Sequence, residues 1–143
     1  FYQGRIAQKH ANYLEANGSP LRGQDFAQYQ ARITKPLQVT TSLGQLYNMT
    51  APTQGVSSLM ILALFDRLKV EKAESFAHLH GLIEATKQAF IQRNSALGDP
   101  RNMQVSAQDW LLDENLDQKV AAINSEKAMA WPYVPSEGDT IWT

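Results

Sequence analysis

The side chains of this chain that could hold a metal ion are His78, His80 and Glu84. His78 and His80 are two positions apart, which places them about 200° apart around a helix, so they cannot bind one ion together. His80 and Glu84 are four positions apart and share a helix face, a spacing that can bind metal. Because a third ligand at a matching spacing is lacking, we expect no metal site. We expect instead that His80 and Glu84 form a hydrogen bond inside the protein.

The sequence carries no signal for a nucleotide, a sugar or another cofactor. Gly98-Asp99-Pro100 combines Gly and Asp as some phosphate and metal loops do, but a helix stop with an Asp-stabilised turn explains it. No Gly-x-Gly-x-x-Gly or Walker pattern occurs. The three tryptophans are too scattered in the sequence to suggest a stacking platform for bases. We therefore expect no bound cofactor.

Composition excludes several classes of partner. The chain has 143 residues, of which 43% are hydrophobic, which fits one domain with an ordinary core. Its net charge of -1 gives no electrostatic attraction for nucleic acid or an anionic membrane. The absence of Cys excludes disulfides and a thiol nucleophile. The longest apolar run, residues 59–65, is far shorter than the roughly 20 residues that cross a bilayer, so we expect no membrane partner.

The first third of the chain predicts two helices and a hairpin. Apolar residues recur at helical spacing over residues 2–16, and Asn17-Gly18-Ser19-Pro20 then supplies a left-handed stop followed by proline. Residues 24–30 predict a short helix. Extended-chain formers on both sides of Ser42-Leu43-Gly44 predict a short β-hairpin.

The remainder predicts further helices. Residues 55–68 are apolar on nearly every side, as a buried central helix must be, and Thr53 is the expected N-cap. Ser75 is expected to cap a second long helix that ends near Leu97. One or two short helices are expected over residues 107–124. The second long helix is predicted to have one apolar face, made of Phe76, Leu79, Leu82, Ile83, Ala85, Ala89 and Phe90.

Three sequence blocks stand out by their order and spacing. The first is Ala51-Pro52-Thr53-Gln54-Gly55, which runs into the apolar helix. The second is HGLIEATKQAF at residues 80–90, followed by Leu97-Gly98-Asp99-Pro100. The third is Gly138-Asp139-Thr140. Together they resemble the second half of the large subunit of the γ-glutamyltransferases, also called γ-glutamyltranspeptidases.

The resemblance implies a catalytic role for Thr140, which by itself would be an ordinary threonine in a turn. In such N-terminal-nucleophile hydrolases the threonine hydroxyl attacks the carbonyl before it, here that of Asp139, and hydrolysis of the resulting ester frees an α-amino group. An α-amino group with a pKa of about 7.7–8.0 can accept the proton of the same hydroxyl near neutral pH. One residue then provides both nucleophile and base.

The resemblance also sets expectations for the fold and for missing parts. It implies a mainly α fold with a short β-hairpin (α+β), the helical lobe of an αββα hydrolase, truncated before most of the catalytic sandwich. The partners would be the N-terminal and small-subunit portions of the same precursor, which hold the substrate-binding arginine and the oxyanion hole. Since an oxyanion donor alone contributes about 10²–10³ in rate, we expect this fragment to be inactive. Glu84 and Arg93 are expected to form a buried or half-buried structural pair with the next loop.

The chain departs from the usual family pattern beside Thr140. Typical members read Thr-Thr-His after the cleavage point, whereas here Thr140 is followed by Ile141 and Trp142, and residues 51–55 replace a Pro-Pro-Ser-Ser-Gly-Gly type of turn. In both respects the chain is similar to the bacterial branch that includes oxamate amidohydrolase. Two substrate classes therefore stay open: γ-glutamyl amides such as glutathione, and small amides such as oxamate. Cytoplasm and periplasm also both stay open.

We expect residues 1–130 to form the helical lobe and residues 131–143 to be a connector that contains the processing site, Asp139 and Thr140. The Pro- and Gly-rich composition of that connector is typical of an exposed loop. The alternative is a self-associating helical interaction domain without catalysis. In that case the apolar helix over residues 56–65 would pair with a second copy to give a homodimer.

Overall fold

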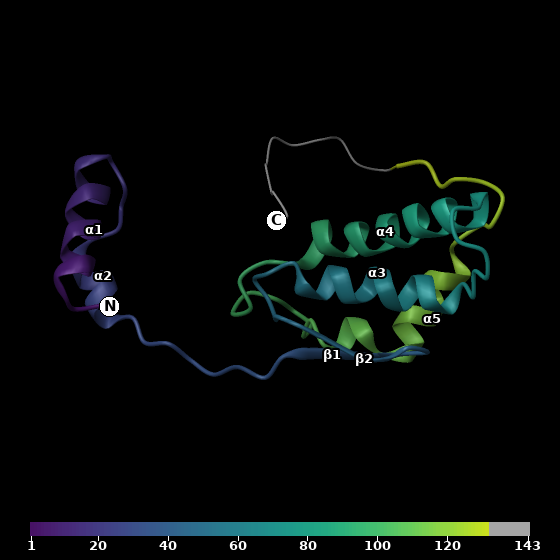
Figure 1. Ribbon diagram of the computed structural model, residues 1–143, viewed down its shortest axis with the longest axis horizontal. Helices are drawn as coiled ribbons and strands as arrows, with labels where there is room; N and C mark the ends of the chain where they lie inside the picture. Colours follow the sequence, from purple (N-terminus) through teal and green to yellow (C-terminus); the bar gives the residue numbers. More distant parts are fainter. Residues whose placement is uncertain (132–143) are drawn as a thin grey trace. The chain divides into compact units, whose positions relative to one another are not determined.

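The computed structural model describes residues 1–131, and the chain divides into two compact units between Thr34 and Lys35 (Figure 1). The range expected as one helical lobe, residues 1–130, thus contains a division that the sequence did not indicate. Residues 29–36, around that division, belong to no helix or strand. The expected boundary between lobe and connector, at residue 131, stays a prediction.

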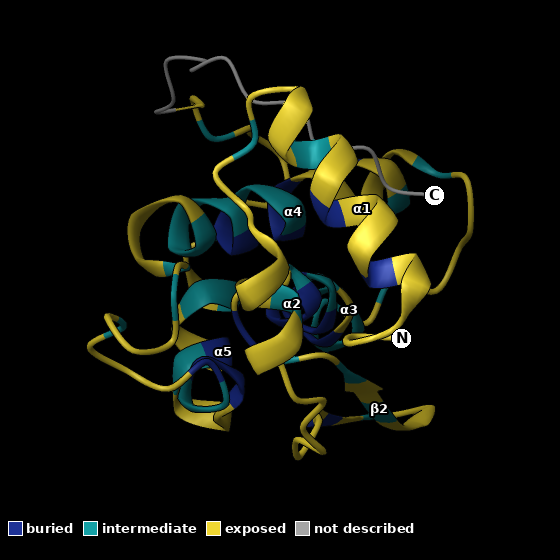
Figure 2. Cartoon of the chain, turned by 90° about the vertical axis from the view of Figure 1, so that its left-hand side faces the viewer, coloured by how far each residue is buried: buried dark blue, intermediate teal, exposed yellow. Residues whose placement is uncertain are grey.

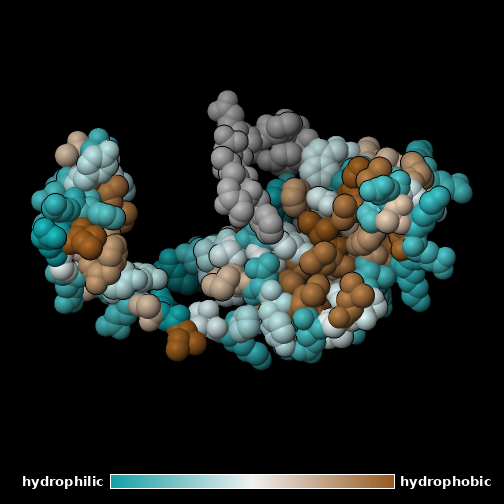
Figure 3. Space-filling view, viewed as in Figure 1, coloured by the Kyte–Doolittle hydropathy of each residue, from teal (hydrophilic) through white to brown (hydrophobic). Residues whose placement is uncertain are grey.

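The first unit is a pair of short helices, α1 (Arg5–Ala16) and α2 (Gly23–Gln28). Gly18 has φ +80°, and the N–H groups of Gly18 and Ser19 bind the carbonyls of Glu15 and Leu14 at 3.1 and 2.9 Å. These are the two bonds of a Schellman motif, so the predicted stop is confirmed. Most of α1 is exposed, as its yellow ribbon in Figure 2 shows. Brown, hydrophobic surface is more extensive over the second unit (Figure 3).

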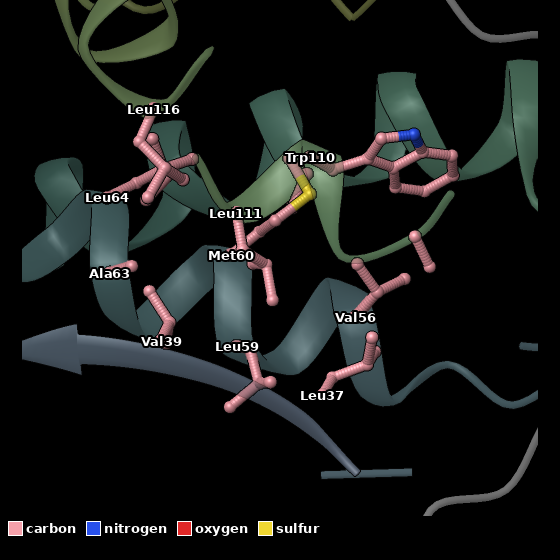
Figure 4. Packing of buried hydrophobic residues seen from close by; sticks show 13 residues of the cluster. Leu37, Val39, Val56, Leu59, Met60, Ala63, Leu64, Trp110, Leu111 and Leu116 are labelled. Atoms are coloured by element: carbon pink, nitrogen blue, oxygen red, sulfur yellow. The ribbon is translucent and has the colours of Figure 1, made fainter. Parts of the chain in front are cut away.

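The second unit is built around one helix, α3 (Gly55–Arg67). It contacts α4 (Phe76–Ala96), the hairpin of β1 (Leu37–Thr41) and β2 (Gly44–Asn48), the 3₁₀ helix η1 (Asp109–Leu111) and α5 (Asp113–Ala121). The predicted helices and hairpin are therefore confirmed. Figure 4 shows side chains of β1, η1 and α5 packed around those of α3. The buried hydrophobic cluster consists of Leu37, Val39, Val56, Leu59, Met60, Ala63, Leu64, Ala85, Ala89, Ala107, Trp110, Leu111 and Leu116.

Most of the apolar surface of residues 56–65, the stretch expected to self-associate, is covered in this structure. Of the large apolar residues in this stretch only Leu62 is exposed, and Ile61 and Phe65 are half-buried. The buried ones are covered by helices and by the hairpin, all supplied by the same unit. Little exposed apolar surface therefore remains on this helix, and the homodimer expected through it stays a prediction.

The hairpin is fixed to the rest of the unit at two places. At its turn, the Ser42 N–H donates to Asp66 Oδ2 at 2.9 Å and the Ser42 hydroxyl donates to Asp66 Oδ1. The hydroxyl first, and the N–H second, hold the pKa of Asp66 below its ordinary value. Along β1, the side-chain amide of Gln108 accepts from the Gln38 N–H at 3.0 Å and donates to the Gln38 carbonyl at 2.9 Å.

The predicted apolar face of α4 is correct for Ala85 and Ala89, which are buried, and wrong for its N-terminal members. The buried positions of the helix are His80, Gly81, Glu84, Ala85, Gln88 and Ala89. The large apolar residues at its N-terminal end are exposed instead: Phe76 (67%), Leu79 (56%), Leu82 (36%) and Ile83 (55%). The physical reason is close packing: a Cβ on Gly81 would lie only 3.0 Å from Leu68 Cδ1, so small residues are needed where α4 lies against the end of α3.

The two predicted N-caps have different outcomes. Ser75 caps α4 as expected, because its hydroxyl accepts from the His78 N–H at 3.2 Å. Thr53 is not the N-cap of α3, which is Gln54. The Thr53 hydroxyl still accepts from the Gly55 N–H at 3.3 Å and lies 3.2 Å from the Met49 carbonyl oxygen, so it holds the loop that precedes the helix.

Among residues 1–131, no helix combines the length and the apolarity that crossing a membrane would need.

Replacing Gly55 by Ala should lower the free energy of unfolding by about 2–3 kcal/mol, because a Cβ there would lie 2.2 Å from the Met49 carbonyl oxygen and 2.8 Å from Asn48 Oδ1. Gly98→Ala is the matched control, since nothing lies within 4 Å of its Cβ position, and it should change the value by less than about 0.5 kcal/mol. Urea denaturation followed by circular dichroism measures both. Equal effects of the two substitutions would contradict the packing argument.

Candidate functional site

The predicted processing pair, Asp139 and Thr140, lies outside the described residues. The structure does describe the segment that leads toward it, residues 122–131, which follows α5 and contains no helix or strand. A segment without regular secondary structure must obtain partners for its backbone groups elsewhere. For the Asn124 carbonyl and for the N–H and carbonyl of Met129, those partners are side chains of α4.

Three side chains of α4, His80, Glu84 and Lys87, bind backbone atoms of this segment, and we call them the α4 anchor. His80 Nε2 donates to the Asn124 carbonyl at 2.7 Å. Glu84 Oε2 accepts from the Met129 N–H at 3.1 Å, and Lys87 Nζ donates to the Met129 carbonyl at 2.7 Å. The backbone N–H and the backbone carbonyl of Met129 are therefore both held by one helix.

The expected hydrogen bond between His80 and Glu84 is wrong. His80 is buried beside the stacked ring of Phe76, at a centroid distance of 5.0 Å, and its Nε2 binds Asn124. Glu84 uses one carboxylate oxygen for Lys87 Nζ, at 2.6 Å, and the other for Met129. Both residues lie on one helix face, as their spacing predicted, but each binds the 122–131 segment.

Glu84 is a buried carboxylate that stays ionised. Its side chain is 1% exposed, and burial alone would raise its pKa. The hydrogen bond from Lys87 and then the N–H of Met129 favour the charged form and together outweigh burial, so the pKa of Glu84 lies below its ordinary value of 4.5. Lys87 is half-buried, with 17% of its side chain exposed. The anchor therefore contains a charged pair whose hydrogen bonds are shared with the segment.

Arg93 and Glu84 are both structural, as expected, but they do not act as one pair. Arg93 Nη1 donates to Gln54 Oε1 at 2.9 Å, and its guanidinium lies 3.8 Å from the centre of the Phe90 ring. Gln54 is the N-cap of α3, so Arg93 connects the second sequence block to the first.

A pocket of about 550 Å³ opens between the C-terminal half of α4, the loop after it and α5. Lys119 and Gln92 lie on its wall, and Lys119 Nζ donates to Gln92 Oε1 at 3.1 Å. Burial lowers the pKa of Lys119. The pocket lining is mixed polar and apolar and contains no clustered acid and base, so no reaction follows from it.

The loop at Gly98-Asp99-Pro100 is a turn, as predicted. Asp99 Oδ1 accepts from the Arg101 N–H at 2.9 Å, and the Arg101 side chain and N–H lower the pKa of Asp99 to about 2. Among residues 1–131, no three His, Asp or Glu side chains lie close enough together to hold a metal ion. Within the described residues, His80 and Glu84 therefore have no third side chain with which to bind a metal ion.

Sequence reasoning missed one residue of the anchor, Lys87, and its backbone partner Met129. Lys87 carries a readable signal, because it is three positions after Glu84 and such pairs meet on a helix surface. Met129 carries none, because it contributes only its backbone N–H and carbonyl, which every residue except proline has.

Comparison with known proteins connects these blocks to one family. The model of the family described as Gamma-glutamyltranspeptidase matches residues 1–143. The chain is 37% identical, over 142 residues, to the oxamate amidohydrolase proenzyme of Klebsiella pneumoniae, which covers 99% of this chain and 27% of that protein. It is 28% identical, over 143 residues, to the glutathione hydrolase-like YwrD proenzyme of Bacillus subtilis, covering 99% of this chain and 26% of that protein.

A solved structure supports the same fold. The chain resembles γ-glutamyltranspeptidase of Helicobacter pylori with a TM-score of 0.80 at 20% identity, over 94% of this chain and 40% of that one. The expected fold class, mainly α with a short β-hairpin, is confirmed, and it is the fold of part of a γ-glutamyltranspeptidase chain. The chain spans about a quarter of the length of these curated relatives.

Glu84→Gln should lower the free energy of unfolding by about 2 kcal/mol at pH 7, because Lys87 then loses its charged partner. A carboxyl whose pKa is lowered by folding stabilises the fold above its ordinary value of 4.5, and this contribution is lost as pH falls through the folded pKa. The difference between wild type and variant should therefore shrink from about pH 4.5 downward. Urea denaturation between pH 3 and pH 7 measures it, and a difference that grows on acidification would contradict the charge assignment.

Proposed function

This chain belongs to the γ-glutamyltranspeptidase family, and we propose from that membership that it is the helical lobe of an autoprocessing threonine amidohydrolase that acts on a small amide. The observation that carries the proposal is its 37% identity to an amidohydrolase proenzyme over 99% of the chain. Both curated relatives are proenzymes by name, which supports a precursor that is cut into subunits.

Thr140 is the proposed nucleophile in both reactions. In processing, its hydroxyl oxygen attacks the Asp139 carbonyl carbon, and the peptide C–N bond breaks as the nitrogen gains the proton. Water then hydrolyses the ester, which leaves a carboxylate on Asp139 and a free amine and hydroxyl on Thr140. In turnover, that amine accepts the hydroxyl proton while the hydroxyl attacks the substrate amide, ammonia leaves, and water releases the acid.

A small amide is the proposed substrate because two features favour it over a γ-glutamyl amide. The identity to the oxamate amidohydrolase proenzyme exceeds that to the glutathione hydrolase-like protein, at 37% against 28%. In addition, the sequence after the cleavage point is Thr140-Ile141-Trp142, whereas typical γ-glutamyl enzymes have Thr-Thr-His there. A γ-glutamyl amide such as glutathione is the second substrate class.

A self-associating interaction domain is the second candidate function. The observation that favours it is the exposed apolar surface of α4, formed by Phe76, Leu79, Leu82 and Ile83. Exposed apolar surface of this kind marks a place where another protein surface packs. In the first proposal, the rest of the precursor covers the same residues.

Expression of the complete open reading frame should give two polypeptides divided between Asp139 and Thr140, and Thr140→Ala should give one intact chain. Loss of the hydroxyl removes the attacking atom, so processing should be abolished. Mass spectrometry of the purified products locates the cut. Thr143→Ala is the matched control and should be processed like wild type. An uncut wild-type chain would favour the interaction-domain function.

The 143-residue chain by itself should show no turnover, because the family's oxyanion hole is expected in the small subunit. Ammonia release from oxamate and hydrolysis of a γ-glutamyl anilide are the two assays. The processed full-length protein should release ammonia from oxamate with a kcat/KM at least tenfold above that for the γ-glutamyl compound. The reverse preference would overturn the small-amide assignment, and activity of the isolated chain would overturn the two-part site.

A further inference from the structure

We propose that the α4 anchor is a positioning device for autoprocessing: His80, Glu84 and Lys87 fix residues 124–129, from which the chain continues to the Asp139–Thr140 bond. This inference rests on the proposed function, because it assigns a role in the cleavage that was proposed above. In this proposal the three anchor side chains hold residues 124–129 in place and do not take part in bond making or breaking.

The contacts select one conformation of an otherwise irregular segment. Asn124 Oδ1 accepts from the N–H groups of Glu126 and Lys127, at 2.8 and 2.9 Å, so the segment begins with a local turn. His80 then holds the Asn124 carbonyl, and Glu84 and Lys87 hold the N–H and the carbonyl of Met129. The two ends of the stretch from 124 to 129 are thus bound to one helix, the first about one turn from its start and the second about two to three turns from it.

Breaking the hydrogen bonds of Glu84 and Lys87 to Met129 costs free energy, and this cost holds Met129 in one position. Glu84 is 1% exposed, and a buried carboxylate that loses a donor pays the desolvation of an ionised group. Lys87 Nζ likewise divides its hydrogen bonds between Glu84 and Met129. If Met129 left this position, both members of the pair would lose a partner at once. An apolar contact would impose no such directional requirement.

Glu84 itself is not a candidate acid or base for the reaction. Both carboxylate oxygens are already occupied, one by Lys87 and one by the Met129 N–H. A group that transfers protons must be accessible to the reacting atoms. The geometry therefore favours a positioning role over a catalytic one.

Holding both ends of residues 124–129 fixes the position and direction of the backbone at Met129, from which the chain continues toward the Asp139–Thr140 bond. A misplacement of reacting groups by about 1 Å can cost up to about 10²-fold in rate. Because the anchor lies about ten residues before the bond, we expect a smaller effect of about 2- to 10-fold on the rate.

The test compares processing rates of the complete precursor in cell-free translation, with cut and uncut chains quantified over time. Glu84→Gln and Lys87→Gln should each slow the cleavage about 2- to 10-fold. Asp117→Asn is the matched control: it breaks an ion pair with Arg67, at 3.0 Å, that does not involve residues 122–131, and it should be cut at the wild-type rate. Val39→Ala, a core substitution in β1, controls for general loss of stability.

A second measurement distinguishes local positioning from general stability. Hydrogen exchange followed by mass spectrometry, on the uncut Thr140→Ala precursor, should show faster exchange of peptides covering residues 124–131 when Glu84→Gln is added, with α3 and α5 unchanged. Glu84→Gln cleavage at the wild-type rate, or slowing no greater than that of a Val39→Ala precursor with an equal fall in Tm, would overturn the inference. An uncut wild-type precursor would instead refute the proposed function, and the inference with it.

Discussion

The close contact between α3 and α4 determines the organisation of the second unit. Gly81 lies against Leu68, and Ala85 and Ala89 are fully buried on the same side of α4. Because small residues occupy the contact, the two helices approach closely and α3 becomes the centre around which the hairpin, η1 and α5 pack. The same contact sets the rotation of α4 about its axis. Polar side chains are thereby directed to the 122–131 segment, and large apolar ones face away from α3.

Local features of this fold were readable in the sequence. The stop of α1 at Asn17 and Gly18, the cap of α4 at Ser75 and the hairpin turn before Gly44 each depend on residues close together in the chain. The orientation of α4 was not readable, because a search for an apolar face assumes that the largest apolar residues are buried. Close helix packing uses the smallest ones instead, and only the partner helix reveals this.

The candidate site was less readable than the fold. Glu84 was identified as a buried, structural residue, but its partners were not, since one is a backbone group from a distant segment. Asp139 and Thr140 lie beyond the described residues, so their assignment depends on sequence resemblance and on family membership. The structure contributes the anchored path toward them. The role of these contacts in processing can therefore be tested by substitutions in α4.

The bond between Gln108 and Gln38 has a consequence for sheet growth. The Gln38 N–H and carbonyl are the groups with which the outer side of β1 would pair with a further strand, and the Gln108 amide occupies both. A side chain thus takes the place of a neighbouring strand at that position, which blocks edge-to-edge pairing. A further strand could therefore pair with β1 at Gln38 only by displacing the Gln108 side chain.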